Sequence, residues 1–223
     1  MQFIEYADAE LMMMDLADTL ASQLRQALAL GDRASLAVPG GTTPGPIFDS
    51  LCAVDIDWAR VDIMLTDERW VPETSDRSNT RLLRQRLLTN RAAAARLVPL
   101  YADAVTPEEN LAELEAGVAA TLPLSVVLLG MGLDMHTASI FPGADRLEDA
   151  LNGAALLVPM RAPGAPEPRI TLSAAVLNGA MSRHIVITGA AKREAFERAK
   201  SLPPAEAPVA AVLKGATIHW AEN

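Results

Sequence analysis

Apolar residues recur at four-residue intervals near the start of the chain. The residues at this spacing are Met12, Leu16, Leu20, Leu24 and Leu28. Four-residue spacing places side chains on one face of an α-helix, and glycine, here Gly31, is common at a helix end. The pattern therefore predicts an amphipathic helix over residues 9–30.

Short apolar runs alternate with helix-like stretches along the rest of the chain. Four runs have the length of a strand and end in a glycine turn or in charged residues; they cover residues 34–38, 61–66, 125–129 and 185–188. Helical patterns lie near residues 47–51, 80–88 and 106–121, between the first three runs, and near 189–196 after the last. This alternation predicts an α/β fold in which a mostly parallel sheet carries helices on both faces, a Rossmann-like three-layer architecture.

The connections between these elements are short. Residues 106–121 begin with their own helix signature, since Thr106 offers an N-cap, Pro107 suits the first helical position and Glu109 completes a capping box. The Pro/Ala-rich stretches 161–168 and 202–208 are short enough to be surface loops. Because no linker separates two halves of the chain, we expect residues 1–223 to form a single domain.

Composition and charge narrow the choice of partners. Of the 223 residues, 50% are hydrophobic and 21% charged, which excludes a predominantly disordered chain. Aromatic residues are only 4%, too few to suggest a base-stacking platform. The formal net charge is −9, and a field of that sign repels polyanions. We therefore expect no nucleic-acid partner, and an anionic small molecule would need local cations for its capture.

Neither cysteine chemistry nor a membrane segment is predicted. Cys52 is the only cysteine, so an intrachain disulfide and a two-cysteine redox motif are both impossible. The amino-terminal residues lack the basic flank and apolar stretch of a secretory signal. The uncharged run that is relevant to a membrane, residues 122–133, is shorter than the roughly 20 residues of a membrane-spanning helix. We expect a soluble, cytoplasmic protein without a membrane partner.

Two candidate clusters follow the first two predicted strands. In a parallel sheet, ligands bind beyond the carboxyl ends of the strands. Gly40, Gly41 and Thr42 form a turn whose backbone amides could hold a phosphate, although a plain tight turn fits the same residues and no Walker lysine follows. Asp67, Glu68 and Arg69 follow the second strand. They indicate either an ion pair at a solvated strand end or a bidentate phosphate site at Arg69.

Two further clusters follow later strands. Asp134 and His136 lie two residues apart in a glycine-rich loop, where a neutral imidazole could act as a base or merely lie on the surface. Arg169 and Lys192 supply isolated cations, and Lys192 falls in a first helical turn, where a cation opposes the helix dipole. The other two histidines, His184 and His219, are expected to be structural. The three histidines are too dispersed along the sequence to suggest a metal site.

Together these motifs resemble the glucosamine-6-phosphate isomerase/6-phosphogluconolactonase family. The resemblance runs nearly from end to end and rests on five segments, residues 39–44, 66–72 with 78–79, 130–142, 168–172 and 188–192. The glycine turn, the Asp-Glu after the second strand and the Asp-x-His loop are also similar to the deaminase branch. Arg69-Trp70 and the segment 168–172 resemble the lactonase branch.

The resemblance implies hydrolysis of 6-phospho-D-glucono-1,5-lactone to 6-phosphogluconate, with no metal and no cofactor. It implies that His136 is the general base toward water, oriented by Asp134, and that Arg69, Arg169, Lys192 and the amides of residues 40–42 hold the phosphate or sugar oxygens, with Asp67 in the same binding site. This chain has Met135 where the family usually has glycine. We expect the loop to keep the family geometry, with Met135 in a left-handed conformation.

Two other functions compete with lactone hydrolysis. An amino-sugar phosphate isomerase/deaminase would use Asp67 as the base for a proton shift. A non-catalytic sugar-phosphate sensor would keep the pocket without the chemistry, and the Met135 substitution is the only feature that favours it.

Overall fold

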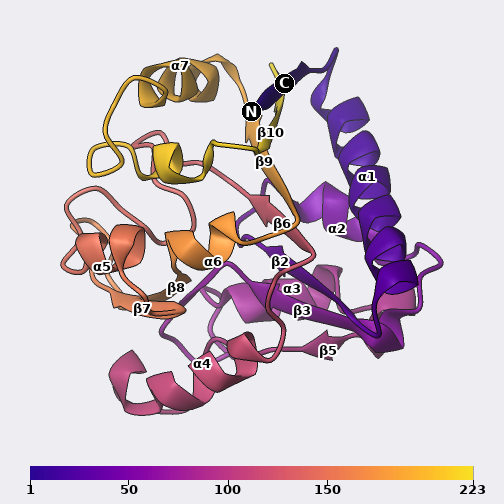
Figure 1. Cartoon of the computed structure of the whole chain (residues 1–223), viewed down its shortest axis with the longest axis horizontal. Helices are drawn as coiled ribbons and strands as arrows, with labels where there is room; N and C mark the ends of the chain where they lie inside the picture. The colour runs from indigo at the N-terminus through magenta and orange to yellow at the C-terminus, as the bar shows by residue number, and fades with distance from the viewer. Residues whose placement is uncertain (223) are drawn as a thin grey trace.

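The protein, described here from a computed structural model, forms a twisted parallel sheet between two layers of helices. The structure describes residues 1–222, and Asn223 lies outside the described residues. Figure 1 shows α1 and α2 on one side of the sheet and α5, α6 and α7 on the other. The predicted α/β fold with helices on both faces is therefore confirmed.

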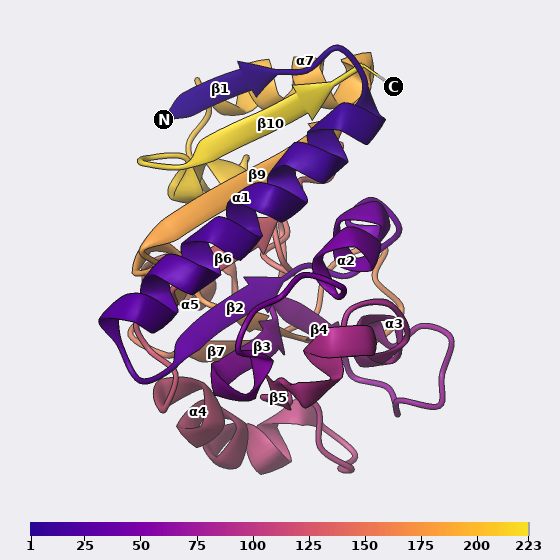
Figure 2. The ribbon, with the colours of Figure 1, turned by 90° about the vertical axis from the view of Figure 1, so that its right-hand side faces the viewer.

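The main sheet has seven parallel strands in the order β1-β10-β9-β6-β2-β3-β5, which Figure 2 shows running side by side behind α1. Its strands are Gln2–Glu5 (β1), Ala34–Val38 (β2), Val61–Leu65 (β3), Arg96–Leu97 (β5), Val126–Leu129 (β6), Ser182–Thr188 (β9) and Thr217–Ala221 (β10). β2, β3 and β6 are buried along their whole length, because helices cover both faces. Their sequences accordingly read as mainly apolar runs, interrupted by Ser35 in β2 and Asp62 in β3.

A second, smaller sheet lies beside the main one. It contains three antiparallel strands in the order β4-β8-β7, which are Asp67–Arg69, Arg169–Leu172 and Leu157–Met160. The sequence analysis did not predict this sheet. β4 consists of three charged residues, so its strand conformation is set by pairing with β8 and not by local propensity.

Helices complete the layers: α1, α2, α3, α4 and α7 lie near their predicted positions, whereas α5 and α6 were not predicted. The α-helices are Ala9–Leu30 (α1), Gly45–Leu51 (α2), Asn79–Arg86 (α3), Leu111–Ala119 (α4), Leu147–Asn152 (α5), Ala174–Asn178 (α6) and Ala190–Ala199 (α7). Shorter 3-10 turns are Trp58–Arg60 (η1), Asn90–Ala94 (η2), Pro107–Asn110 (η3) and Pro208–Val212 (η4). The predicted capping box of Thr106 and Glu109 is present, but it starts η3, which leads directly into α4.

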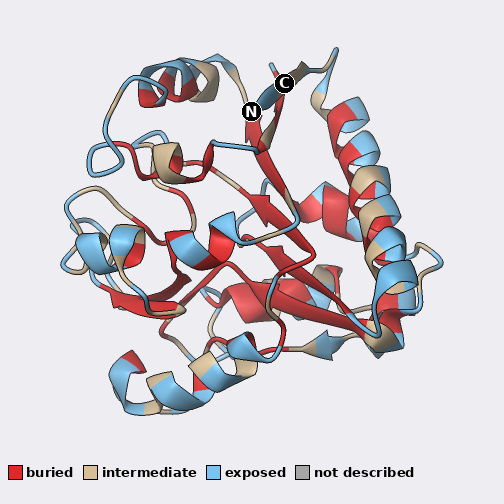
Figure 3. Ribbon diagram, viewed as in Figure 1, coloured by how far each residue is buried: buried red, intermediate tan, exposed pale blue. Residues whose placement is uncertain are grey.

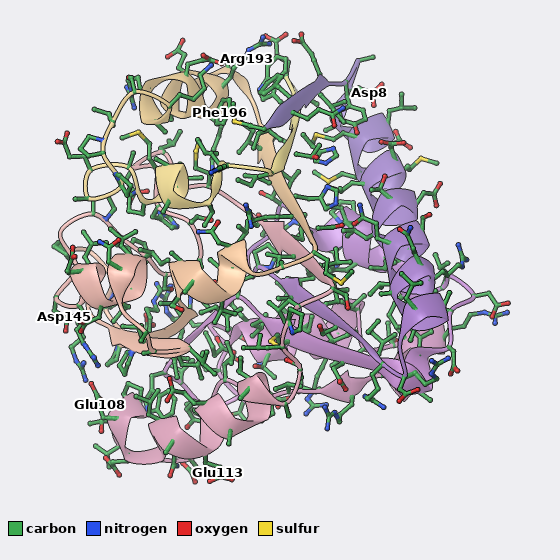
Figure 4. All side chains as sticks on the ribbon, viewed as in Figure 1. Asp8, Glu108, Glu113, Asp145, Arg193 and Phe196 are labelled. Carbon is green, nitrogen blue, oxygen red and sulfur yellow. The ribbon has the colours of Figure 1, made fainter. Side chains whose placement is uncertain are left out.

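Burial follows the layers. Figure 3 shows the central strands buried throughout, while α1 is buried on one side and exposed on the other. Met12, Leu16, Leu20 and Leu24 are all 0% exposed, as the four-residue spacing predicts. The N-cap of this helix is Asp8, labelled at its start in Figure 4, whose carboxylate accepts the amide of Leu11 at 2.8 Å.

No helix of the described residues is long and apolar enough to cross a membrane. The Pro/Ala-rich stretches 161–168 and 202–208 lie in turns and loops, except that Pro208 begins η4.

Candidate active site

A cavity of about 220 Å³ lies beyond the carboxyl ends of β2, β3, β6 and β9. Parallel strands all deliver their following loops to this one edge of the sheet. Seven of the predicted site residues line the cavity, namely Gly40, Gly41, Asp67, Arg69, His136, Arg169 and Lys192. The other two do not line it: Thr42 belongs to the same glycine turn, and Asp134 lies behind His136.

The imidazole of His136 is paired with the carboxylate of Asp134. Nδ1 of His136 lies 2.5 Å from Oδ1 of Asp134, and the same oxygen accepts the amide of His136 at 3.2 Å. Burial opposes ionisation of Asp134, but the hydrogen bond and charge of His136 outweigh it, so the pKa of Asp134 is lowered. An ionised Asp134 accepts the proton on Nδ1, which leaves Nε2 of His136 as the basic nitrogen.

The loop that carries this pair is tightly wound, and one position in it requires glycine. A Cβ added at Gly132 would lie 2.1 Å from Nδ1 of His136 and 2.3 Å from Oδ1 of Asp134. Met135 has φ 65°, so the predicted left-handed conformation is confirmed. Its amide donates to Gly132 O at 3.0 Å, and its carbonyl accepts the amide of Val209 at 3.0 Å. These contacts on both sides hold the strained residue in place.

Phe141 contacts both the imidazole and one of the cations. Its ring centroid lies 4.3 Å from that of His136, and Cζ of Arg169 lies 5.6 Å from it. The 5.6 Å distance is within the range for cation–π contact, and the 4.3 Å separation places the two rings in direct contact. The two functional side chains are thus fixed against one shared surface.

Three cations converge on the cavity. Arg69 of β4 and Arg169 of β8 are directly opposite in the antiparallel pair, an arrangement that like charges disfavour. Within residues 1–222, the Nε atoms of both arginines are buried and lack a hydrogen-bond partner. Burial lowers the pKa of Arg169, and the charge of Arg69 adds to that effect while Asp67 opposes it. Two repelling guanidiniums with unused donors form a site suited to an anion.

Lys192 reaches the cavity from the first turn of α7. Its Nζ donates to the carbonyl of Met131. Burial lowers its pKa, and the charge of Asp134 opposes the change. The unusual position of a cation at a helix start therefore coincides with a place in the cavity wall.

The carboxylates after β3 are buried, so the interpretation of a solvated strand end is wrong. Asp67 is 6% exposed and Glu68 is 0% exposed. Oδ2 of Asp67 accepts the hydroxyl of Ser139 at 2.6 Å, and Oδ1 accepts that of Thr66 at 3.1 Å. The physical reason is the second sheet, because β8 covers this segment and Ser139 reaches it from the loop after β6.

Sequence reasoning gave no role to Asn79, which lines the cavity from the start of α3. The only signal for it was its place in the segment 78–79, because asparagine at a helix start is ordinary. His184 and His219, far apart in sequence, meet on adjacent strands with Nδ1 and Nε2 2.9 Å apart. Among residues 1–222, no group of three or more His, Cys, Asp or Glu side chains is placed to hold a metal ion.

Comparison with known proteins adds an independent test. The family model described as glucosamine-6-phosphate isomerases/6-phosphogluconolactonase matches residues 7–220. The chain belongs to this family. A 6-phosphogluconolactonase from Rhizobium meliloti (strain 1021) is 45% identical over 215 residues, which cover 92% of each chain. The resemblance found in the sequence is therefore confirmed.

Solved structures of the isomerase/lactonase family share the fold. A crystal structure of a 6-phosphogluconolactonase from Shewanella baltica OS155 has a TM-score of 0.96 and 35% identity, covering 99% of this chain and 97% of that one. A monomeric glucosamine-6-phosphate deaminase has a TM-score of 0.81 at 15% identity, covering 99% and 97%. At that identity the deaminase shows the fold alone. Proteins named for two different activities therefore share this fold.

Proposed function

We propose that this protein is a 6-phosphogluconolactonase, which hydrolyses 6-phospho-D-glucono-1,5-lactone to 6-phosphogluconate. The observation that carries the proposal is one cavity in which the His136–Asp134 pair lies with Arg69, Arg169 and Lys192. A base and an anion site are the two features that a phosphorylated lactone requires. The relatives named 6-phosphogluconolactonase, at 45% and 35% identity, support the same assignment.

In the proposed mechanism, His136 is the general base. Nε2 takes a proton from water as the water oxygen bonds to the lactone carbonyl carbon, giving a tetrahedral intermediate. The bond from that carbon to the ring oxygen then breaks, and the imidazolium returns its proton to the departing oxygen. Asp134 holds the proton on Nδ1 and stabilises the imidazolium between the two steps. The product is the open-chain acid, which ionises in water.

The cations serve binding in this proposal. Arg69, Arg169 and Lys192 hold the phosphate or the sugar oxygens, and the backbone amides of residues 40–42 contribute from the glycine turn. Asp67, held by Ser139 at 2.6 Å, is placed to accept a hydrogen bond from a sugar hydroxyl.

The wider setting also stays a prediction. We expect residues 1–223 to act as one lactonase domain, and the buried hydrophobic side chains of the described residues form one core cluster, which supports this. The pentose phosphate or Entner–Doudoroff pathway, and a cytoplasmic location, are the settings expected from the sequence.

The decisive experiment is a coupled assay with freshly generated δ-lactone. Product is followed with a dehydrogenase, and the rate is corrected for spontaneous ring opening. We expect turnover well above that background. A parallel assay measures ammonia release from glucosamine 6-phosphate: release without lactonase activity would instead assign the deaminase branch with Asp67 as base. Binding without any turnover would assign a sensor.

A further inference from the structure

Glu68 is the most enclosed carboxylate next to the cavity, yet it faces away from it. It is the middle residue of β4, and side chains alternate between the two faces of a strand. Asp67 and Arg69 therefore face the cavity, where both line its wall, while Glu68 points to the opposite side and is 0% exposed. A buried carboxylate is costly unless its oxygens are satisfied.

Five donors satisfy the carboxylate of Glu68, and all of them belong to β4 or to the start of α3. Oε1 accepts the amides of Arg69 at 2.7 Å and Asn79 at 2.9 Å. Oε2 accepts the amide and hydroxyl of Thr80, both at 2.7 Å, and the hydroxyl of Ser78 at 3.2 Å. Each oxygen thus receives at least two donors, and these bonds partly offset the burial that raises the pKa of Glu68.

These bonds lead to the cavity wall by two routes. The first is Arg69, whose backbone amide donates to Glu68. The carboxylate of Glu68 therefore fixes the backbone from which the guanidinium of Arg69 extends. The second is Asn79, whose side chain lines the cavity and donates to Asp67 O at 3.2 Å. A Cβ added at Gly40 would lie 2.1 Å from Cγ of Asn79, so Asn79 packs directly on the backbone of the glycine turn.

We propose that Glu68 is a positioning residue for anion binding, which holds Arg69 and, through Asn79, the Gly40 turn in register around the ligand phosphate. It reaches the cavity only through these neighbours. This inference rests on the proposed function. It adds a determinant of substrate affinity that lies outside the cavity.

The test is Glu68→Gln, which keeps the shape of the side chain. In glutamine, an NH2 group replaces one of the two oxygens. Whichever oxygen it replaces, its N–H groups then face the donors that bound that oxygen. We expect the KM for the lactone and the Kd for inorganic phosphate to rise by about 10- to 100-fold, as for displaced binding groups. kcat should fall by less than the rise in KM.

Asp62→Asn is the matched control. Asp62 is also a buried carboxylate of this segment, 2% exposed, but it lies at the other end of β3 and binds Arg33 and Arg96 at 2.5 and 2.6 Å. Asp62→Asn should lower the melting temperature, because a buried ion pair is lost, but it should leave KM and the phosphate Kd unchanged. An equal rise in KM in both variants would overturn the proposal, because general loosening would then explain it.

A milder variant keeps the proposal testable if Glu68→Gln does not fold. Thr80→Val removes one hydroxyl donor to Glu68, keeps the side-chain volume, and alters a residue that does not line the cavity. It should raise the phosphate Kd by about two- to fivefold, since a single hydrogen bond is lost. An unchanged Kd in this folded variant overturns the proposal. Wild-type protein without lactonase activity would instead refute the proposed function, and the phosphate Kd values would still report on Glu68.

Discussion

The imidazole of His136 is the residue on which the proposed chemistry depends. Replacing it with alanine should lower kcat by about 10²- to 10⁴-fold, the usual contribution of general base catalysis, with little change in KM. Steady-state kinetics with δ-lactone measure this. An unchanged kcat would remove His136 from the mechanism.

Met135 offers a test of backbone strain at the neighbouring position. A left-handed conformation costs a residue with a side chain roughly 1 to 2 kcal/mol, and glycine avoids that cost. Lost packing of the half-buried side chain offsets part of the gain. Met135→Gly should therefore stabilise the protein by up to about 1 kcal/mol in chemical denaturation and leave kcat unchanged.

Ala138 provides the control for this substitution, because it has φ 49° in the same loop and only a methyl group to lose. Ala138→Gly should also stabilise the protein. If both variants lower the free energy of unfolding, the left-handed residues of this loop are not strained.

At the scale of elements, the binding cations come from different parts of the chain, Arg169 from β8 and Lys192 from α7. Alanine at either position should chiefly raise KM, because a remote phosphate binds equally in the ground and transition states. Inorganic phosphate should inhibit the wild type competitively. Arg33 and Arg91 pair with Asp62 and Asp55 away from the cavity, so alanine there should leave KM unchanged. A rise in KM from those two variants would show that the phosphate site lies elsewhere.

A buried histidine pair joins β9 and β10 to the first elements of the chain. His184 bonds to His219 and to Gln23, both at 2.9 Å, and His219 bonds to Tyr6 at 2.9 Å. Tyr6 in turn donates to Asp15 at 2.6 Å. Burial lowers the pKa of both histidines from 6.5 to about 4. The folded protein therefore keeps them neutral at a pH where the unfolded chain protonates them.

This difference gives the pair a defined effect on acid stability. The free energy of unfolding should be highest above pH 6.5 and should fall as pH decreases from about 6.5 to 4, by a few kcal/mol in all. Urea denaturation at pH 7 and pH 5 measures this. His219→Gln should flatten the slope between those values. A flat wild-type profile in this range would contradict the assignment.

The elements that were predictable are those whose signal is local. Periodicity alone located α1, and apolar runs located β2, β3 and β6, because strands buried on both faces are mainly apolar. β4 and the burial of Glu68 were not predictable. The three charged residues of β4 form a strand only because β8, about a hundred residues later in the chain, pairs with them. The clusters after β2, β3 and β6 could be placed together because loops after parallel strands meet at one edge. Arg169, on β8 of the second sheet, was assigned from the family resemblance, and Asn79 gave no local signal.

At the scale of the whole molecule, a chain with a formal net charge of −9 gathers three cations in one cavity. The negative charge of the whole molecule repels anions, so binding of an anionic substrate depends on these three cations. Their arrangement also has an energetic cost in the free protein. Arg69 and Arg169 repel each other across β4 and β8, and each keeps a buried donor that has no partner within the described residues.

The opposed arginines imply a trade-off between stability and activity. Replacing a poorly paired, half-buried cation with an apolar side chain of similar length often stabilises a protein. Arg169→Met should therefore raise the melting temperature by about 2 to 4 °C while weakening substrate binding. In the wild type, phosphate but not chloride at equal ionic strength should restore that stability through mass action. The substrate of this enzyme would then also act as its stabiliser, and cells short of sugar phosphates would hold it in a less stable form.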